Sequence, residues 1–253
     1  LDDLARGQST AAYVSPQELV EAALRHGVEG IAFTYSEPAI WLEYILDVAP
    51  IARQNGLYLV YVSNSFVTDE ALEMMAPHID VMCSDIKSLD EDFYKEICRL
   101  ATVDQVLGSI KKAQQLGVHV ETRTNIIPQK NDDPEMLKRI GIWIRDNLGA
   151  DSPWHLTKFF PAYKLSHLPA TPSEILQQSY QQALQLGLEN VYVYDDIGCD
   201  CAEQNLPVAS YLAGDTESIH AVKQCAASCC GDEGVLLKKY EQTDSLVSGK
   251  SCK

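Results

Sequence analysis

The sequence has no long apolar segment and few basic residues for its length. None of its apolar runs approaches the roughly 20 residues that a membrane helix needs, and residues 1–7 do not have the pattern of a signal peptide. The 253 residues include 36 Asp and Glu against 20 Lys and Arg, a net charge of −16, and no basic patch interrupts the acidic background. We therefore expect a cytoplasmic protein with neither a membrane nor a nucleic-acid partner.

Cysteine is absent before Cys83 and is concentrated near the other end of the chain. Six of the eight cysteines follow residue 198: Cys199, Cys201, Cys225, Cys229, Cys230 and Cys252. In a reducing compartment such thiols indicate metal or redox use rather than disulfides. The close thiols at 225–230 suit a thiophilic metal, and free thiols in an irregular tail are the alternative. We assign no metal ligand, and we expect Cys83 and Cys98 to be packing residues.

Short β-rich runs alternate with amphipathic helical stretches from residue 15 to about residue 196, which is the pattern of parallel βα units. The expected strands are nearly continuous apolar runs at residues 30–35, 58–63, 80–85, 118–125, 155–159 and 190–194. The expected helices lie near residues 16–25, 40–54, 69–75, 104–116, 134–147 and 172–186. This α/β order predicts either an open doubly wound sheet or a curved, partly closed barrel.

Residues typical of helix ends support these boundaries. Ser15, Pro16 and Glu18 predict a capping box with a first-turn proline. Further caps are expected at Thr68, Asp104, Asp133 and Thr171, and helix exits with positive φ at Gly27, Gly56, Gly117 and Gly187. The periodicity stops near residue 197, so we expect a domain boundary there and a Cys-rich, largely irregular tail at 198–253.

Polar residues follow the expected strands, at the edge where parallel α/β folds bind ligands. They are Glu37 with Pro38, Ser63 with Asn64, Asp85 with Lys87, and Arg123. A carboxylate, a hydroxyl, an amide, a lysine and an arginine on one rim are suited to a zwitterion that carries both an ammonium and a carboxylate group. The sequence therefore predicts one shared binding site.

Each of these residues also has a purely structural explanation. Glu37 is placed to begin a helix, Ser63 and Asn64 to form an Asx turn, and Lys87 to pair with a nearby aspartate at the surface. Arg123 is different, because an unpaired guanidinium inside an apolar strand costs on the order of several kcal/mol. We expect Arg123 to have an anionic partner.

Five segments together resemble a known family. They are Tyr35-Ser36-Glu37-Pro38, Val62-Ser63-Asn64, Ser84-Asp85-Ile86-Lys87, Arg123 five residues before Pro128, and the run WHLTKFFPAYK from Trp154 to Lys164. In order and spacing they are similar to the radical S-adenosylmethionine (SAM) enzymes related to pyruvate formate-lyase activating enzyme. Within these the resemblance is to the branch of the AmmeMemoRadiSam system.

The resemblance implies a (β/α)6-type partial barrel over residues 15–197 that binds SAM across its strand ends. Glu37 and Pro38 would lie against the methionyl amino group, and Ser63 and Asn64 near the sugar and methionine. Lys87 and Arg123 would meet carboxylate or hydroxyl groups, and Asp85 belongs to the same set. Activating enzymes often carry a histidine where this sequence has Phe160, so one adenosine contact would differ.

The resemblance also implies a 4Fe-4S cluster, held by three cysteines in the loop after the first strand. No cysteine stands there, so we expect a fragment of a longer enzyme, with the first strand missing and residues 1–14 as the remnant of the loop that follows the cluster segment. With its cluster, such an enzyme cleaves SAM and forms a 5′-deoxyadenosyl radical that abstracts hydrogen. An electron-donor protein is implied, while the substrate, small molecule or protein, stays open.

Two other interpretations of the function remain. The chain could be a non-catalytic, degenerate barrel that acts as a scaffold or binds metal through Cys225, Cys229 and Cys230. It could also be a lyase or aldolase of the (β/α)8 type, with Lys87 as its Schiff-base amine. His155 could either reach the site or be a core histidine.

Overall fold

Six parallel strands form one sheet in the computed structural model, which describes residues 13–34, 37–99 and 102–194. They are β1 (Gly30–Phe33), β2 (Tyr58–Ser63), β3 (Val81–Asp85), β4 (His119–Ile126), β5 (Trp154–Lys158) and β6 (Val191–Tyr194). Each strand pairs in parallel with the next along the chain, so the sheet order equals the sequence order. This order confirms the predicted partial barrel. The expected tail and the boundary at residue 197 lie outside the described residues.

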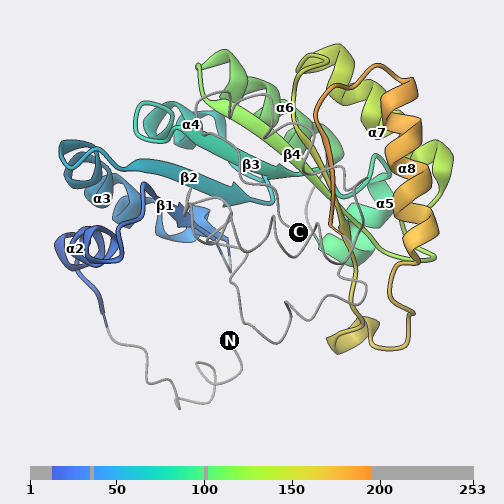
Figure 1. The fold of residues 1–253 in the computed structure, drawn as a ribbon, viewed down its shortest axis with the longest axis horizontal. Coiled ribbons are helices and arrows are strands. Elements are labelled where there is room, and N and C mark those ends of the chain that lie inside the picture. The colour runs from blue at the N-terminus through green and yellow to red at the C-terminus, as the bar shows by residue number, and fades with distance from the viewer. Residues whose placement is uncertain (1–12, 35–36, 100–101, 195–253) are drawn as a thin grey trace, which may run out of the picture.

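Helical segments connect the strands and pack against the sheet (Figure 1). The longer ones are α2 (Pro16–His26), α3 (Leu42–Gln54), α4 (Asp69–Met75), α6 (Val103–Gln115), α7 (Pro134–Asn147) and α8 (Ser173–Gln185). Short segments are η1 (Pro38–Trp41), α5 (Glu91–Phe93), the π-helical η2 (Tyr94–Cys98) and η3 (Tyr163–Leu165). In the described part of the chain, no helix combines the length and apolarity required to span a bilayer.

The two faces of the sheet differ in composition. Leu59 and Tyr61 of β2 belong to the main core with the helices, whereas Val60, Val62 and Cys83 form a separate apolar cluster on the opposite, inner face. Successive side chains of a strand alternate between faces, and Cys83 is in register with Glu121 of β4. His119, Glu121 and Arg123 therefore also belong to the inner face, which is apolar over β2 and β3 and polar over β4.

Most predicted helix ends are confirmed. Ser15 and Glu18 form the reciprocal capping box, and Thr68 and Asp133 each accept a hydrogen bond from the backbone of their first helical turn. Gly27, Gly56, Gly117 and Gly187 all have positive φ, between 67° and 86°. These side-chain and glycine signals act within one turn of the chain, which is why the sequence alone identifies them.

Two predicted caps are wrong. Thr102, rather than Asp104, caps α6, and Asp104 lies in the first turn, where its charge favours the helix dipole. Thr171 does not cap α8, whose first flanking residue is Pro172. The Thr171 hydroxyl instead accepts from the backbone N–H of Phe159 at 2.7 Å and donates to the carbonyl of Ile126 at 2.6 Å. The local sequence pattern predicts a helix cap at Thr171, but its hydroxyl instead bonds to backbone groups that are distant in the sequence.

Gly30 gives a direct test of the packing of β1 on β2. A Cβ added at Gly30 would lie 2.5 Å from the ring of Tyr58, whereas one added at Gly108 in α6 would meet nothing within 4 Å. We expect Gly30→Ala to lower the free energy of unfolding by about 1–3 kcal/mol through overpacking. Gly108→Ala, the matched control, should raise it by up to about 1 kcal/mol through helix propensity. Equal urea midpoints for the two variants would contradict this packing.

Candidate functional site

Glu37 lies at the centre of a hydrogen-bond network between the ends of β1 and β2. Its Oε1 accepts from the Ser63 hydroxyl at 2.7 Å, and its Oε2 accepts from the backbone N–H of Asn64 at 2.9 Å. Longer bonds of 3.4 Å reach Oε1 from the Tyr61 hydroxyl and from the N–H of Ala39, the second residue of η1. Oε2 has this single hydrogen bond among the described residues, so it keeps accepting capacity for a further donor.

The loop after β2 is fixed by its own side chains. Asn64 Oδ1 accepts from the N–H of Phe66 at 2.8 Å, which is an Asx turn, and Ser63 Oγ accepts from the N–H of Ser65 at 2.9 Å. Ser65 has a φ of 63°, and the Ser109 hydroxyl of α6 donates to its carbonyl. The backbone N–H of Asn64 is thereby held toward Glu37.

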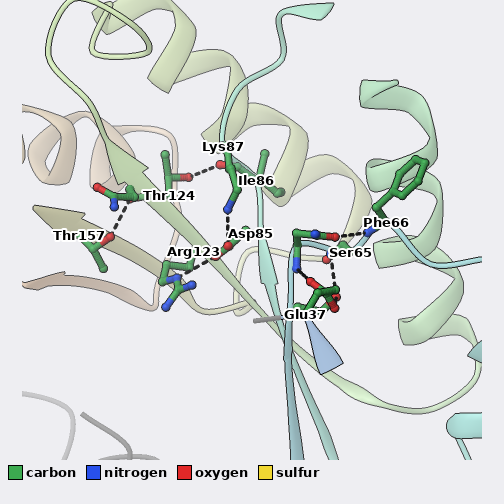
Figure 2. A network of polar contacts seen from close by, with 12 residues as sticks. Glu37, Ser65, Phe66, Asp85, Ile86, Lys87, Arg123, Thr124 and Thr157 are labelled. Carbon is green, nitrogen blue, oxygen red and sulfur yellow. Dashed lines mark hydrogen bonds and ion pairs between the residues drawn. The ribbon is translucent and has the colours of Figure 1, made fainter. Parts of the chain in front are cut away.

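Asp85 forms a second network at the ends of β3 and β4. Its Oδ1 accepts from Nε of Arg123 at 2.8 Å, and its Oδ2 accepts from Nζ of Lys87, so both cations converge on one carboxylate (Figure 2). The Asp85 side chain is 13% exposed, against 36% for Arg123. Burial alone would raise the pKa of Asp85, but the charges of Lys87 and Arg123 outweigh it and hold this pKa below its usual range.

Backbone contacts hold this second network in place. The N–H of Ile86 donates to the carbonyl of Arg123 at 2.9 Å, and the Thr124 hydroxyl donates to the carbonyl of Ile86 at 2.8 Å. The Asn131 amide donates to the carbonyl of Lys87 at 2.6 Å, and the buried Tyr94 hydroxyl accepts from the N–H of Lys87 at 3.2 Å. The position of Lys87 is therefore set from both sides.

The predicted site residues thus fall into two networks at the same edge of the sheet. One contains Glu37, Ser63 and Asn64, and the other contains Asp85, Lys87 and Arg123. Pro38 begins η1 and is buried. The structural explanations hold as well, since Glu37 caps η1, Asn64 forms the Asx turn, and Lys87 pairs with Asp85. Arg123 has its anionic partner in Asp85.

A third polar cluster lies on the inner face over β4, β5 and β6. His155 Nε2 lies 2.9 Å from Oε2 of Glu121, and its Nδ1 lies 3.0 Å from the Tyr194 hydroxyl. His119 Nε2 is 3.5 Å from the other oxygen, Oε1, of Glu121. The sequence predicted only that His155 could reach a site. The alternation of His119, Glu121 and Arg123 along β4 was the available signal for the rest.

Electrostatics makes Glu121 the fixed negative charge of that cluster. Burial would raise the pKa of Glu121, but the hydrogen bonds and charges of His119 and His155 lower this pKa to about 2. In return the hydrogen bond to Glu121 raises the pKa of His119, whose side chain is 56% exposed. His155 also stacks on Tyr192, with ring centroids 5.0 Å apart.

The described cysteines are not suited to holding an iron-sulfur cluster. Burial in the apolar inner face raises the pKa of Cys83 to about 12, which keeps it a thiol, whereas cluster ligands are thiolates. Cys98 belongs to the π-helical segment η2. Within residues 13–34, 37–99 and 102–194, no group of three or more His, Cys, Asp or Glu could hold a metal ion. The six cysteines after residue 198 lie outside the described residues.

Comparison with known proteins places the chain in a family. Residues 5–140 match the model of the radical SAM superfamily, so the chain belongs to this superfamily. It is 39% identical over 180 residues to an uncharacterized protein of Methanocaldococcus jannaschii, covering 71% of this chain and 53% of that protein. It is 23% identical over 120 residues to the (2S)-3-sulfopropanediol dehydratase activating enzyme of Klebsiella oxytoca, covering 47% of this chain and 38% of the enzyme.

Solved structures share the fold at low identity. A domain of a pyruvate-formate lyase-activating enzyme from Bacteroides vulgatus superposes with a TM-score of 0.57 at 17% identity, covering 66% of this chain and 99% of that domain. Streptococcus suis SuiB bound to S-adenosylmethionine gives 0.55 at 14% identity, covering 74% of this chain and 43% of SuiB. The chain spans about half the length, or less, of these curated relatives. The narrower AmmeMemoRadiSam branch stays a prediction.

Removal of the charge on Asp85 should destabilise the fold strongly. Asp85→Asn leaves two cations side by side with no anion at a mostly buried position, so we expect a loss of about 3–5 kcal/mol in the free energy of unfolding. Asp92→Asn is the matched control, because the Asp92 side chain is 82% exposed, and its effect should stay within about 0.5 kcal/mol. Urea unfolding measures both, and similar midpoints would contradict the role of Asp85.

The lowered pKa of Glu121 predicts a pH dependence of stability. A carboxyl whose folded-state pKa is depressed stabilises the fold above its ordinary pKa of 4.5, and this contribution is lost as the pH falls toward 2. After allowance for the 21% exposure of the side chain, we expect Glu121→Gln to cost about 2 kcal/mol at pH 6 and almost nothing near pH 2. Urea unfolding of the wild type, Glu121→Gln and the exposed-site control Glu43→Gln at several pH values measures this, and a pH-independent difference would refute it.

Proposed function

We propose that this chain supplies the SAM-binding part of a radical SAM enzyme, with the methionyl group of SAM held at the C-terminal ends of β1 to β4. The observation that carries the proposal is the unused hydrogen-bonding capacity of the two networks. Glu37 keeps an accepting position on Oε2, and Asp85 engages only Nε of Arg123 and one N–H of Lys87 among the described residues. Within the described part of the chain, the Nη groups of Arg123 and two N–H groups of Lys87 are left to donate.

These groups complement the charges of SAM. Its methionyl part carries an ammonium group, which suits the Glu37 carboxylate, and a carboxylate, which suits Arg123 or Lys87. Because Asp85 and the Asx turn already hold these side chains, little ordering remains to be done on binding. SuiB, which has a similar fold, was solved with S-adenosylmethionine bound.

The described residues do not supply the cluster, so no reaction step is assigned to it. In a radical SAM enzyme a 4Fe-4S cluster would supply the electron for reductive cleavage of SAM. The residues of this chain would position SAM for that event by holding its amino and carboxylate ends at separate strands. We propose that the radical then abstracts hydrogen from a small-molecule or protein substrate, and that an electron-donor protein reduces the enzyme.

The structure argues against the alternative of a Schiff-base lysine. Nζ of Lys87 is held by the Asp85 carboxylate rather than left to attack a carbonyl carbon. No observation favours the scaffold or metal-carrier interpretation, whose cysteines at 225–230 lie outside the described residues.

SAM binding by the full chain tests the proposal. We expect isothermal titration calorimetry to detect SAM binding to the wild type, and Glu37→Gln to weaken it about ten- to a hundredfold through loss of a charge-assisted hydrogen bond. Glu43→Gln, on the exposed side of α3, should leave the affinity unchanged. Melting curves must show that Glu37→Gln stays folded. A wild type that does not bind SAM, or a folded Glu37→Gln variant with unchanged affinity, would refute the proposal.

A further inference from the structure

Four side chains on the inner face form a continuous row of polar contacts across β6, β5 and β4. The Tyr194 hydroxyl lies 3.0 Å from Nδ1 of His155, and Nε2 of His155 lies 2.9 Å from Glu121. The other oxygen of Glu121 lies 3.5 Å from His119. None of these residues belongs to the two networks proposed to hold SAM, so this row of side chains needs a separate explanation.

This row of side chains runs from the C-terminal ends of the strands to their N-terminal ends. Tyr194 is the last residue of β6 and pairs in register with Thr157, whereas His119 is the first residue of β4 and pairs with Val81, the first residue of β3. His155 lies between them, in register with both Arg123 and Tyr192. The side chain of His155 is only 11% exposed, while that of His119 is 56% exposed. The row therefore connects the proposed ligand site at the C-terminal strand ends with solvent at the N-terminal end of β4.

The end at Tyr194 lies near the proposed site. The Tyr194 hydroxyl lies 3.0 Å from Nδ1 of His155, and His155 is in register with Arg123 on the neighbouring strand. A ligand held by Arg123 would lie on the same inner face as His155, its register partner.

We propose that Tyr194, His155, Glu121 and His119 form a proton-transfer path between a ligand at the C-terminal strand ends and solvent. The ligand class is a substrate that gains or loses a proton at a hydroxyl or amino group beside the reacting carbon. Tyr194 is the residue that would contact this ligand, and the other three are positioning and relay residues. The inference rests on the proposed function only for the presence of a ligand at that edge.

The transfer balances at every step. As the O–H or N–H bond of the ligand breaks, a new O–H bond forms on Tyr194, and the original phenolic proton moves to Nδ1 of His155. The Nε2 proton of His155 passes to Glu121, whose carboxyl group turns toward His119. His119 donates from Nε2 to Glu121 at rest, so it must first exchange with solvent to the neutral tautomer protonated on Nδ1, whose Nε2 then accepts the proton. His119 then releases a proton to water, so one proton enters, one leaves, and no redox partner is needed.

The carboxylate of Glu121 does not block the path. With a pKa of about 2, it is protonated about once in 10⁵ at pH 7. A barrierless proton hop limited only by this population could occur at most about 6 × 10⁷ times per second, far above the turnover of about 1–10³ per second that is typical of enzymes.

Exchange of the Tyr194 hydroxyl proton with solvent tests the path in the full-length protein, with no SAM or substrate present. In this assay water at the strand ends takes the place of the ligand and supplies the proton that replaces the phenolic one, which leaves through His155. The rate can be followed by the isotope shift of ¹³Cζ-labelled tyrosine in mixtures of H₂O and D₂O. We expect His155→Asn and Glu121→Gln to slow this exchange at least about tenfold, and His119→Asn about fivefold or more, because each removes one relay group.

Two variants serve as matched controls. Tyr192→Phe keeps the ring that stacks on His155. His78→Asn makes the same change as His119→Asn, but at a histidine that is not one of the four relay residues. Both should leave the exchange rate within about twofold of the wild type. If the hydrogen bonds only anchored the rings, His155→Asn would release the phenol and speed its exchange, which would overturn the proposal. An effect of His119→Asn equal to that of His78→Asn would overturn it too.

A measurement on the wild type guards against misfolded variants. The path requires neutral His155 to carry its proton on Nε2, facing Glu121, so that Nδ1 can accept from Tyr194. ¹⁵N NMR of the imidazole nitrogens reports this tautomer, and a proton on Nδ1 would overturn the proposal. A wild type that fails to bind SAM in calorimetry would refute the proposed function and leave these exchange results unaffected, so the two failures are distinguishable.

Discussion

The bridge from Asp85 to Arg123 and Lys87 is the interaction on which the polar edge at the C-terminal ends of the strands depends. Arg123 lies in an apolar strand, and Lys87 follows Asp85 by two residues, so two cations meet at the ends of neighbouring strands. One carboxylate with 13% of its side chain exposed compensates both. Buried charges are tolerated only when they are paired and hydrogen-bonded, so this carboxylate decides whether β3 and β4 can present basic groups at all.

Glu37 likewise holds several groups with one carboxylate. Its carboxylate begins η1, fixes the loop after β2 and still retains an accepting position on Oε2. A side chain held by several short contacts cannot choose among many rotamers, so a ligand that binds it finds the geometry already set. Structural and binding roles are therefore not competing explanations for Glu37. The structural contacts are what would make it a precise acceptor for an ammonium group.

The gathering of these polar residues at the C-terminal ends of the strands could be predicted from the sequence, because buried parallel strands are continuous apolar runs and their polar neighbours follow directly. The partner of Arg123 could be required but not named, since Asp85 is 38 residues away and only strand register brings it near. Glu121 and His155, 34 residues apart, were missed as a pair for the same reason. The short π-helical segment η2 was also missed, because its Tyr94 is fixed by a contact with the backbone of Lys87 rather than by local propensity.

The inner face of β4 to β6 contains polar side chains at positions where apolar ones would avoid a desolvation cost. Barrel interiors are usually filled by branched apolar side chains, as Val60, Val62 and Cys83 fill the β2 and β3 side here. Glu121 and His155 instead satisfy each other in a mostly buried position, at a desolvation cost that an apolar pair would not incur. A sequence that places polar groups where apolar ones would fold as well breaks a local rule, and such departures concentrate where the protein acts on a ligand. The polar inner face is therefore the feature of this sheet that packing does not explain and that the proposed proton path does.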